Sequence, residues 1–209
     1  MEEFIEEDIT IVPQEEIIGE GENARKRLVL KGIFSEANSL NRNKRVYPKA
    51  VLREIYTEAM ERSRRTGKPI FGELEHSSKA NPILDRIAVK FPVLEWDEEK
   101  GQIIGEAVPT STPAGNIVKG LAEDGFPICF STKMSGKVTP LTEEKAKSYG
   151  ITESIENCVE VMPGARLLSI DVVGEQSCQK AISTTVYEGF EGENSNGEKL
   201  QNIMEELFC

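Results

Sequence analysis

The chain has 209 residues, a mass of 23.2 kDa and a formal net charge of −11. This length suits one domain of ordinary size, and the acidic balance disfavours a nonspecific nucleic-acid binder, because phosphate binding needs concentrated lysine and arginine. No run approaches the roughly 20 apolar residues that a membrane span needs, and the acidic start MEEFIEEDIT has the wrong sign for a signal peptide. We therefore expect a cytoplasmic protein of the cell or host, with no nucleic-acid or membrane partner.

The first strongly patterned segment is RLVLKGIF, residues 27–34, whose alternating aliphatic residues predict a strand with one buried face. Before it, residues 1–26 are rich in acidic residues and lead through the turn-rich sequence GEGENARKR into the strand, which predicts an acidic leader or mobile arm. After it, the sequence SEANSLNRNKRVYP predicts a long polar loop. The folded domain is therefore expected to begin at residue 27.

Two helices and a series of strands are predicted in the remainder. One helix begins at Pro48, shows apolar residues at helical spacing and ends at Gly67, and a shorter one begins at Thr112-Pro113 and ends at Gly125. The expected strands cover residues 68–76, 83–97, 102–109, 126–138, 166–174 and 180–189. Residues 139–158 predict only a variable polar passage.

Several β segments with two interspersed helices predict an α+β domain over residues 27–188. The expected architecture is a strongly bent antiparallel sheet or a small β-barrel with a few packed helices. Residues 189–209 have the composition of a linker and predict a C-terminal tail, with a short terminal helix in LQNIMEELF.

The sequence GELEHSS, residues 72–78, contains the single histidine of the chain, His76. Histidine can take and return a proton near neutral pH, since its ordinary pKa is about 6.5. Such a base can serve a nucleophile, and Cys129 and Ser131 share one face of the predicted strand CFSTKMSG. No GxSxG motif surrounds Ser131, so an ordinary structural hydroxyl remains the alternative.

Four acids are candidates to orient the imidazole: Glu73, Glu75, Asp85 and Asp171. Asp171 lies within the apolar run LLSIDVVG, where a carboxylate needs a partner unless it faces solvent from an edge strand. Strand alternation would place Glu73 and Glu75 on one face and His76 on the apolar side. The cysteines at 129, 158, 178 and 209 form no CxxC or Cys/His pair, so no zinc site, disulfide framework or other metal site is predicted.

The order and spacing of these motifs resemble those of the prohead core serine proteases of tailed bacteriophages, particularly the T-even type, which are related to the herpesvirus assemblins. The similarity covers about residues 28–185 and is carried by NRNKRVYP before a helix, GELEH, TPAGNIVKGLAEDGFPICFSTKMSG and LLSIDVVGEQSCQKA. It implies a herpesvirus-protease-like fold, with His76 as general base, Ser131 as nucleophile and Asp171 as third member, ahead of Asp85. It also implies oxyanion-hole donors near Lys133 and Gly136.

Two features depart from the family pattern. The usual Ser-Arg-Gly after the nucleophile is replaced here by Thr132-Lys133-Met134, which puts the details of the oxyanion hole in question. The assemblins carry a second histidine as third member, whereas this chain must use a carboxylate.

The function implied by the resemblance is a serine endopeptidase, without cofactor, that cleaves scaffold and capsid proteins inside the viral prohead in the host cytoplasm. The family cuts after Glu in an (Ile/Leu)-x-Glu context, which predicts self-cleavage at Glu20 and Glu153 and protection of Glu106 within a strand. The alternative is a noncatalytic internal capsid or scaffold protein that retains the protease fold. The oligomeric state is left open, a homo-oligomer included.

Overall fold

The structure is a computed structural model that describes residues 10–18, 25–79, 81–174 and 182–183. Within these residues a main sheet of 8 strands has the order β10-β7-β11-β1-β2-β6-β5-β4. Its strands are β1 (Thr10–Ile18), β2 (Arg25–Glu36), β4 (Ile70–Glu73), β5 (Ile87–Asp97), β6 (Gln102–Pro109), β7 (Ile128–Ser135), β10 (Arg166–Val173) and β11 (Ile182–Ser183). All neighbouring strands pair antiparallel except β1 and β11.

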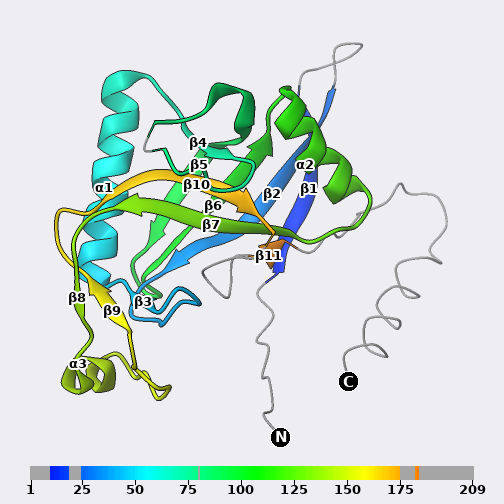
Figure 1. The fold of residues 1–209 in the computed structure, drawn as a ribbon. Helices are drawn as coiled ribbons and strands as arrows, with labels where there is room; N and C mark the ends of the chain where they lie inside the picture. Colours follow the sequence, from blue (N-terminus) through cyan, green and yellow to red (C-terminus); the bar gives the residue numbers. More distant parts are fainter. Residues whose placement is uncertain (1–9, 19–24, 80, 175–181, 184–209) are drawn as a thin grey trace, which may run out of the picture.

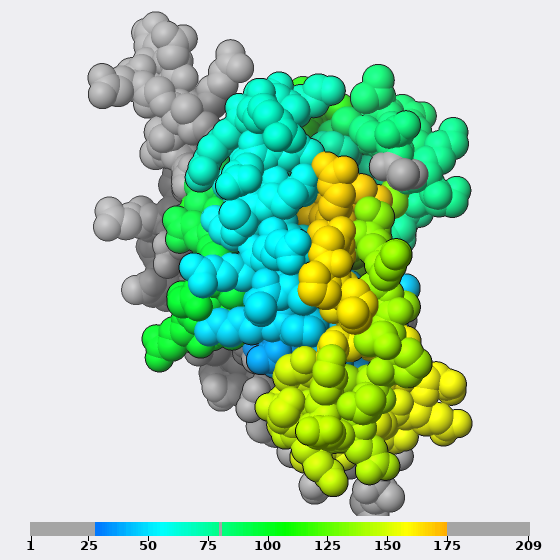
Figure 2. Space-filling model, turned by 90° about the vertical axis from the view of Figure 1, so that its left-hand side faces the viewer, coloured from blue at the N-terminus to red at the C-terminus, as the bar shows by residue number. Residues whose placement is uncertain are grey.

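A smaller sheet of 3 strands, in the order β3-β9-β8, lies at one end of the described part of the molecule (Figure 1). It consists of β3 (Arg45–Val46), β8 (Val138–Pro140) and β9 (Val159–Val161), with the short helix α3 (Glu143–Ser148) beside it. The longer helices are α1 (Lys49–Thr66) and α2 (Pro113–Glu123), and a 3-10 helix, η2 (Leu84–Arg86), precedes β5. Figure 2 shows the segment from β8 to β9 protruding from the body that α1 and β10 form.

The main sheet bends until its two outer strands, β4 and β10, meet. A parallel bridge joins Leu74 to Val172, and the N–H of Glu75 donates to the carbonyl of Val172 over 2.7 Å. The approach is so close that a Cβ on Gly72 would lie 1.9 Å from the carbonyl oxygen of Ile170, which leaves room for glycine alone. The expected α+β fold with a strongly bent, largely antiparallel sheet is therefore confirmed.

The core lies inside this bend, under α1. Phe34 contacts Phe91 and Phe130 edge-to-face, with ring centroids 5.0 and 5.1 Å apart, which is a favourable arrangement of aromatic rings. Helix α1 buries Leu52 and Ile55 against the same cluster. Strands β7 and β10 both contribute buried side chains to this cluster, so one face of each strand packs on the core.

The helix ends follow the sequence signals. Helix α1 starts directly after Pro48 and stops at Gly67, whose φ of 65° is left-handed. Helix α2 is capped by Thr112, whose hydroxyl accepts the N–H of Gly115 over 3.1 Å. It ends at Glu123, two residues before the expected Gly125.

Three expectations about the chain's organisation have different outcomes. The segment expected to be an acidic arm contains β1, which pairs with β2, so the sheet begins before residue 27. The glutamates of β1 interrupt the alternation of apolar and polar residues by which a strand is predicted from sequence. The polar passage 139–158 contains α3, and residues 159–161 form β9 of the small sheet. The tail 189–209 and its terminal helix lie outside the described residues, as does most of the strand expected at 180–189.

Candidate active site

Strands β7 and β10 bring Ser131 and Asp171 together. The two residues are direct partners in the antiparallel ladder, so their side chains leave the sheet on the same face. Their neighbours Phe130 and Ile170 are fully buried on the core side, which fixes the other face for Ser131 and Asp171 by strand alternation.

His76 completes a continuous hydrogen-bonded chain with these two residues. Its Nε2 lies 3.0 Å from the Oγ of Ser131, and its Nδ1 lies 2.6 Å from the Oδ2 of Asp171. The other carboxylate oxygen of Asp171 accepts the N–H of Glu73 over 2.8 Å. With the proton on Nδ1 donated to Asp171, Nε2 is free to accept the serine hydroxyl, which is the arrangement that activates a nucleophile.

Burial differs sharply among the three groups. Asp171 is 0% exposed and Ser131 is 3% exposed, whereas the His76 side chain is 40% exposed. The carboxylate is therefore shielded from water, while the imidazole keeps an open edge. A proton acceptor in this position is accessible to an incoming substrate.

The strand alternation expected for Glu73 and His76 is wrong. Glu73 is buried, at 1% exposure, and His76 lies toward the surface. The reason is that β4 ends at Glu73, and Glu75 then takes a left-handed φ of 63° that turns the chain out of the sheet. The turn carries His76 over the outer face of β7 and β10 instead of into the core.

Several hydrogen bonds fix the turn that presents His76. The guanidinium of Arg86 donates from Nε to the carbonyl of Leu74 over 3.1 Å and from Nη2 to that of Glu75 over 3.2 Å. The carboxylate of Glu75 accepts the N–H of Gly174 over 2.9 Å, which ties the turn to the end of β10. The carboxylate of Glu75 thus bonds to Gly174, and the carboxylate that contacts the imidazole is that of Asp171.

The buried carboxylate of Glu73 is stabilised by several groups around the same turn. Its oxygens accept the N–H of Ile83 over 2.6 Å and the hydroxyl of Ser77 over 2.7 Å, and the ammonium of Lys133 lies 3.5 Å away. Burial alone would raise the pKa of Glu73, but the hydrogen bonds from Ile83 and Ser77 and the charge of Lys133 outweigh it, so the pKa is lowered. Glu73 is therefore held as an anion.

Sequence reasoning missed this cluster. Ser77 stands inside GELEHSS and Lys133 two residues beyond Ser131, but only the fold brings them to Glu73. The signal available was strand alternation, which places Lys133 on the same face as Ser131.

The remaining candidates lie elsewhere. Asp85 is exposed on η2, so it does not occupy the place beside the imidazole. Cys129 shares the strand face of Ser131, but the imidazole bond goes to the serine. Gly136 follows the end of β7 and packs against Ala165; five extended residues place it about 16 Å from Ser131, too far for an oxyanion donor. Lys133 remains the nearer of the two expected donors.

The expected self-cleavage positions also differ in setting. Glu153 is exposed in the irregular segment before β9, whereas Glu106 lies within β6 and pairs with Lys31 over 2.9 Å. Glu20 lies outside the described residues.

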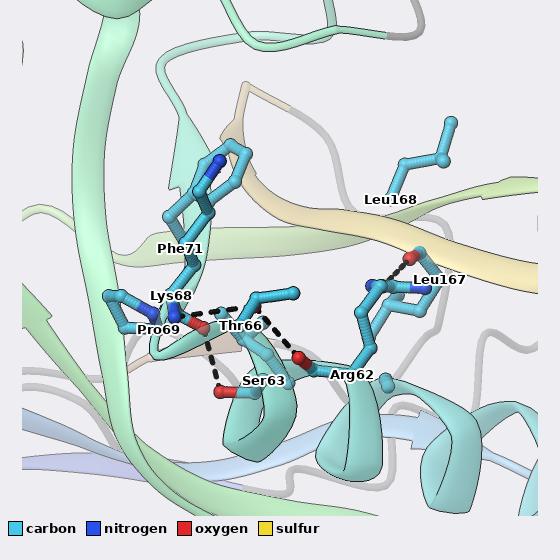
Figure 3. Close-up of a pocket in the computed structure, with 10 residues that line it drawn as sticks. Arg62, Ser63, Thr66, Lys68, Pro69, Phe71, Leu167 and Leu168 are labelled. Atoms are coloured by element: carbon cyan, nitrogen blue, oxygen red, sulfur yellow. Dashed lines mark hydrogen bonds between the residues drawn. The ribbon is translucent and has the colours of Figure 1, made fainter.

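A separate pocket of about 250 Å³ lies between the C-terminal half of α1, the chain from Lys68 to Phe71, and β10 (Figure 3). Arg62 crosses it and donates to the carbonyl of Leu167, and the Ser63 hydroxyl donates to the carbonyl of Lys68 over 2.8 Å. None of the three residues of the hydrogen-bonded chain lines this pocket.

Among the described helices, none has the length and apolar character needed to cross a membrane.

Comparison with known proteins identifies the family. Residues 6–181 match the sequence model of the family described as prohead core protein serine protease. Among solved structures, the bacteriophage T4 capsid assembly protease, gp21, shares the fold with a TM-score of 0.56 and 22% identity, over 79% of this chain and 96% of that one. No curated protein matches the chain. The chain belongs to the prohead core protein serine protease family and is a serine endopeptidase.

Proposed function

We propose that this endopeptidase matures a viral procapsid by cutting scaffold and capsid proteins inside the prohead, with Ser131, His76 and Asp171 as its catalytic triad. The observation that carries the proposal is the continuous chain from the Ser131 hydroxyl through the imidazole to the buried Asp171 carboxylate. Membership of a family of prohead proteases supports the prohead as the site of action. The similarity to a capsid assembly protease of bacteriophage T4 supports a role in capsid maturation.

In the proposed reaction the Ser131 Oγ attacks the scissile carbonyl while His76 Nε2 takes the hydroxyl proton. The tetrahedral intermediate collapses when the imidazolium gives that proton to the leaving amine, and water then hydrolyses the acyl-enzyme with the same base. Asp171 holds the imidazole in the required tautomer and stabilises the imidazolium, and its second oxygen is held by the N–H of Glu73. Each oxyanion donor would contribute about 3 kcal/mol to the transition state, and the backbone N–H of Lys133 is the proposed donor.

The proposed specificity is cleavage after Glu, which predicts an order of self-cleavage. A protease binds an extended, separated backbone, so Glu153 in its exposed irregular segment suits cleavage, and Glu106 in the paired strand β6 does not. Glu20 and Glu153 should be cut first, and Glu106 only after unfolding. Early release of a fragment beginning at Ala107 would contradict the proposed order.

The test is incubation with a candidate scaffold protein, followed by mass mapping of the cut sites. The proposal predicts new termini after Glu with the wild-type chain and none with Ser131→Ala. An intact scaffold after incubation with the wild-type chain, under conditions where a short Glu-containing peptide is cut, would remove scaffold from the substrate class. The absence of any cleavage would favour a noncatalytic capsid protein with the protease fold.

A further inference from the structure

Three side chains form a polar chain beneath the turn that carries His76. The ammonium of Lys133 donates to the hydroxyl of Ser77 over 2.9 Å, and that hydroxyl donates to the carboxylate of Glu73 over 2.7 Å. Lys133 also donates to the carbonyl of Lys79 over 2.5 Å. The Lys133 side chain is 15% exposed and that of Glu73 is 1% exposed, so this ion pair is largely withdrawn from water.

This chain joins the elements that carry the proposed base and nucleophile. Glu73 and Ser77 flank His76 on either side, and Lys133 is two residues beyond Ser131 on the same face of β7. The backbone N–H of Glu73 meanwhile donates to Asp171. The backbone of the turn bonds to Arg86 and to β10, whereas its side chains reach β7 through the contact of His76 with Ser131 and of Ser77 with Lys133.

We propose that Lys133 is a positioning residue, which holds the turn that carries His76 against the strand of Ser131. It does so through its hydrogen bonds to Ser77 and Lys79 and its ion pair with Glu73. The proposal rests on the proposed function, because it assigns Lys133 a role in the geometry of that triad. Nucleophile and base must stay within hydrogen-bond reach, and a displacement of about 1 Å can lower turnover by about 100-fold. The imidazole is 40% exposed, so its own packing restrains it little.

A competing role for Lys133 would be to bind the glutamate side chain of a substrate. The geometry opposes it, because an ammonium group has three N–H donors and Lys133 has three acceptors at Ser77, Lys79 and Glu73. A substrate carboxylate would have to displace one of them. Positioning and substrate binding also predict different kinetics, which makes them separable.

The experiment compares wild type with Lys133→Met and Ser77→Ala, using a peptide spanning residues 14–26 of this chain and a small fluorophosphonate probe. We expect Lys133→Met to lower kcat about 100-fold with little change in KM, and to slow labelling of Ser131 by a similar factor. Ser77→Ala, which retains the Lys133 and Glu73 pair, should lower kcat about 10-fold and serves if Lys133→Met fails to fold. Lys145→Met is the matched control, since it breaks a Lys–Glu pair between α3 and the small sheet, and should leave kcat unchanged.

The imidazole gives a direct readout, because His76 is the single histidine of the chain and its ring signals need no site-specific label. In wild type we expect one set of ring ¹⁵N signals with the Nδ1 proton strongly hydrogen-bonded, and in Lys133→Met a weakened or exchange-broadened Nδ1 proton. Normal kcat and normal ring signals in Lys133→Met would overturn the positioning role. A raised KM with unchanged labelling would instead assign Lys133 to substrate binding, and a wild-type chain that never labels at Ser131 would overturn the proposed function itself.

Discussion

Two regions of this molecule are each built around a buried glutamate paired with a lysine. In the main sheet Glu73 pairs with Lys133, 60 positions away in the chain, and its backbone holds Asp171. In the small sheet Glu160 pairs with Lys145, 15 positions away, and accepts the hydroxyl of Tyr149 over 2.9 Å. The first pair connects strands and a turn that meet only in the folded domain, whereas the second closes one local segment.

The difference shows how one kind of interaction serves two purposes. A buried carboxylate needs partners wherever it occurs, so the pair alone says nothing about function. What distinguishes Glu73 is its surroundings: an open imidazole, a serine and a second buried carboxylate lie on the same face. Variants in the first region should therefore change catalysis, and those in the second should change stability.

The largest effect is expected at the proposed nucleophile and base. Ser131→Ala and His76→Ala should each lower kcat by at least about 10⁴-fold, and the double variant should cost little more, because triad members act as a unit. Peptide cleavage with thermal unfolding as a folding check measures this. Cys129→Ala is the matched control on the same strand face; if it abolishes cleavage while Ser131→Ala does not, the nucleophile is Cys129.

The next effect is expected at the acid. Asp171→Asn should lower kcat by about 10³-fold or more, because the amide favours the wrong imidazole tautomer. Asp85→Asn, exposed on η2, should change kcat by less than about threefold. Steady-state kinetics on both variants checks the ranking, and the reverse order would remove Asp171 from the triad.

The small sheet should respond in stability instead. Glu160→Gln weakens the bonds to Lys145 and Tyr149 and should lower the free energy of unfolding by roughly 1 to 2 kcal/mol, since Lys145 is half exposed and its pairing is screened. Urea unfolding measures the change, and peptide cleavage should stay near the wild-type rate. A loss of activity without a loss of stability would show that the two regions are coupled.

The smallest effect is a pH dependence in the same region. Burial, with the hydrogen bond and negative charge of Glu160, raises the pKa of Tyr149 from 10.0 to about 12. A pKa that is raised in the folded state favours the neutral phenol. The stability that Tyr149 contributes to the folded protein is therefore complete below pH 10 and is lost as the pH rises from 10 to about 12. The stability difference between wild type and Tyr149→Phe should therefore shrink as the pH rises from 10 to about 12. A constant difference would contradict the shift.

The sequence was most informative where one residue had few alternatives. A single histidine and a carboxylate inside the apolar run LLSIDVVG made His76 and Asp171 candidates, and the resemblance to the prohead proteases assigned their expected roles; the structure places both residues in one hydrogen-bonded chain with Ser131. The direction of His76 could not be predicted, because it depends on the left-handed turn at Glu75, a residue that does not usually adopt it.

The contacts of Lys133 with Ser77, Lys79 and Glu73 could not be predicted from the sequence either, because these residues become neighbours only when β4 and β10 meet. Strand β1 escaped prediction for a different reason: its sequence TIVPQEEII carries a proline and two adjacent glutamates, so pairing with β2 rather than residue pattern identifies it. Local propensity is a weak guide where tertiary pairing decides the outcome.

The most direct test of the proposed triad is covalent labelling with a fluorophosphonate, followed by peptide mass mapping. Such a probe phosphonylates a serine whose hydroxyl is activated by a neighbouring base, and it needs no knowledge of the substrate. We predict one modified residue, Ser131, with labelling abolished in Ser131→Ala and strongly slowed in His76→Ala. Labelling at another residue, or an unmodified Ser131 in folded wild-type protein, would contradict the proposed triad.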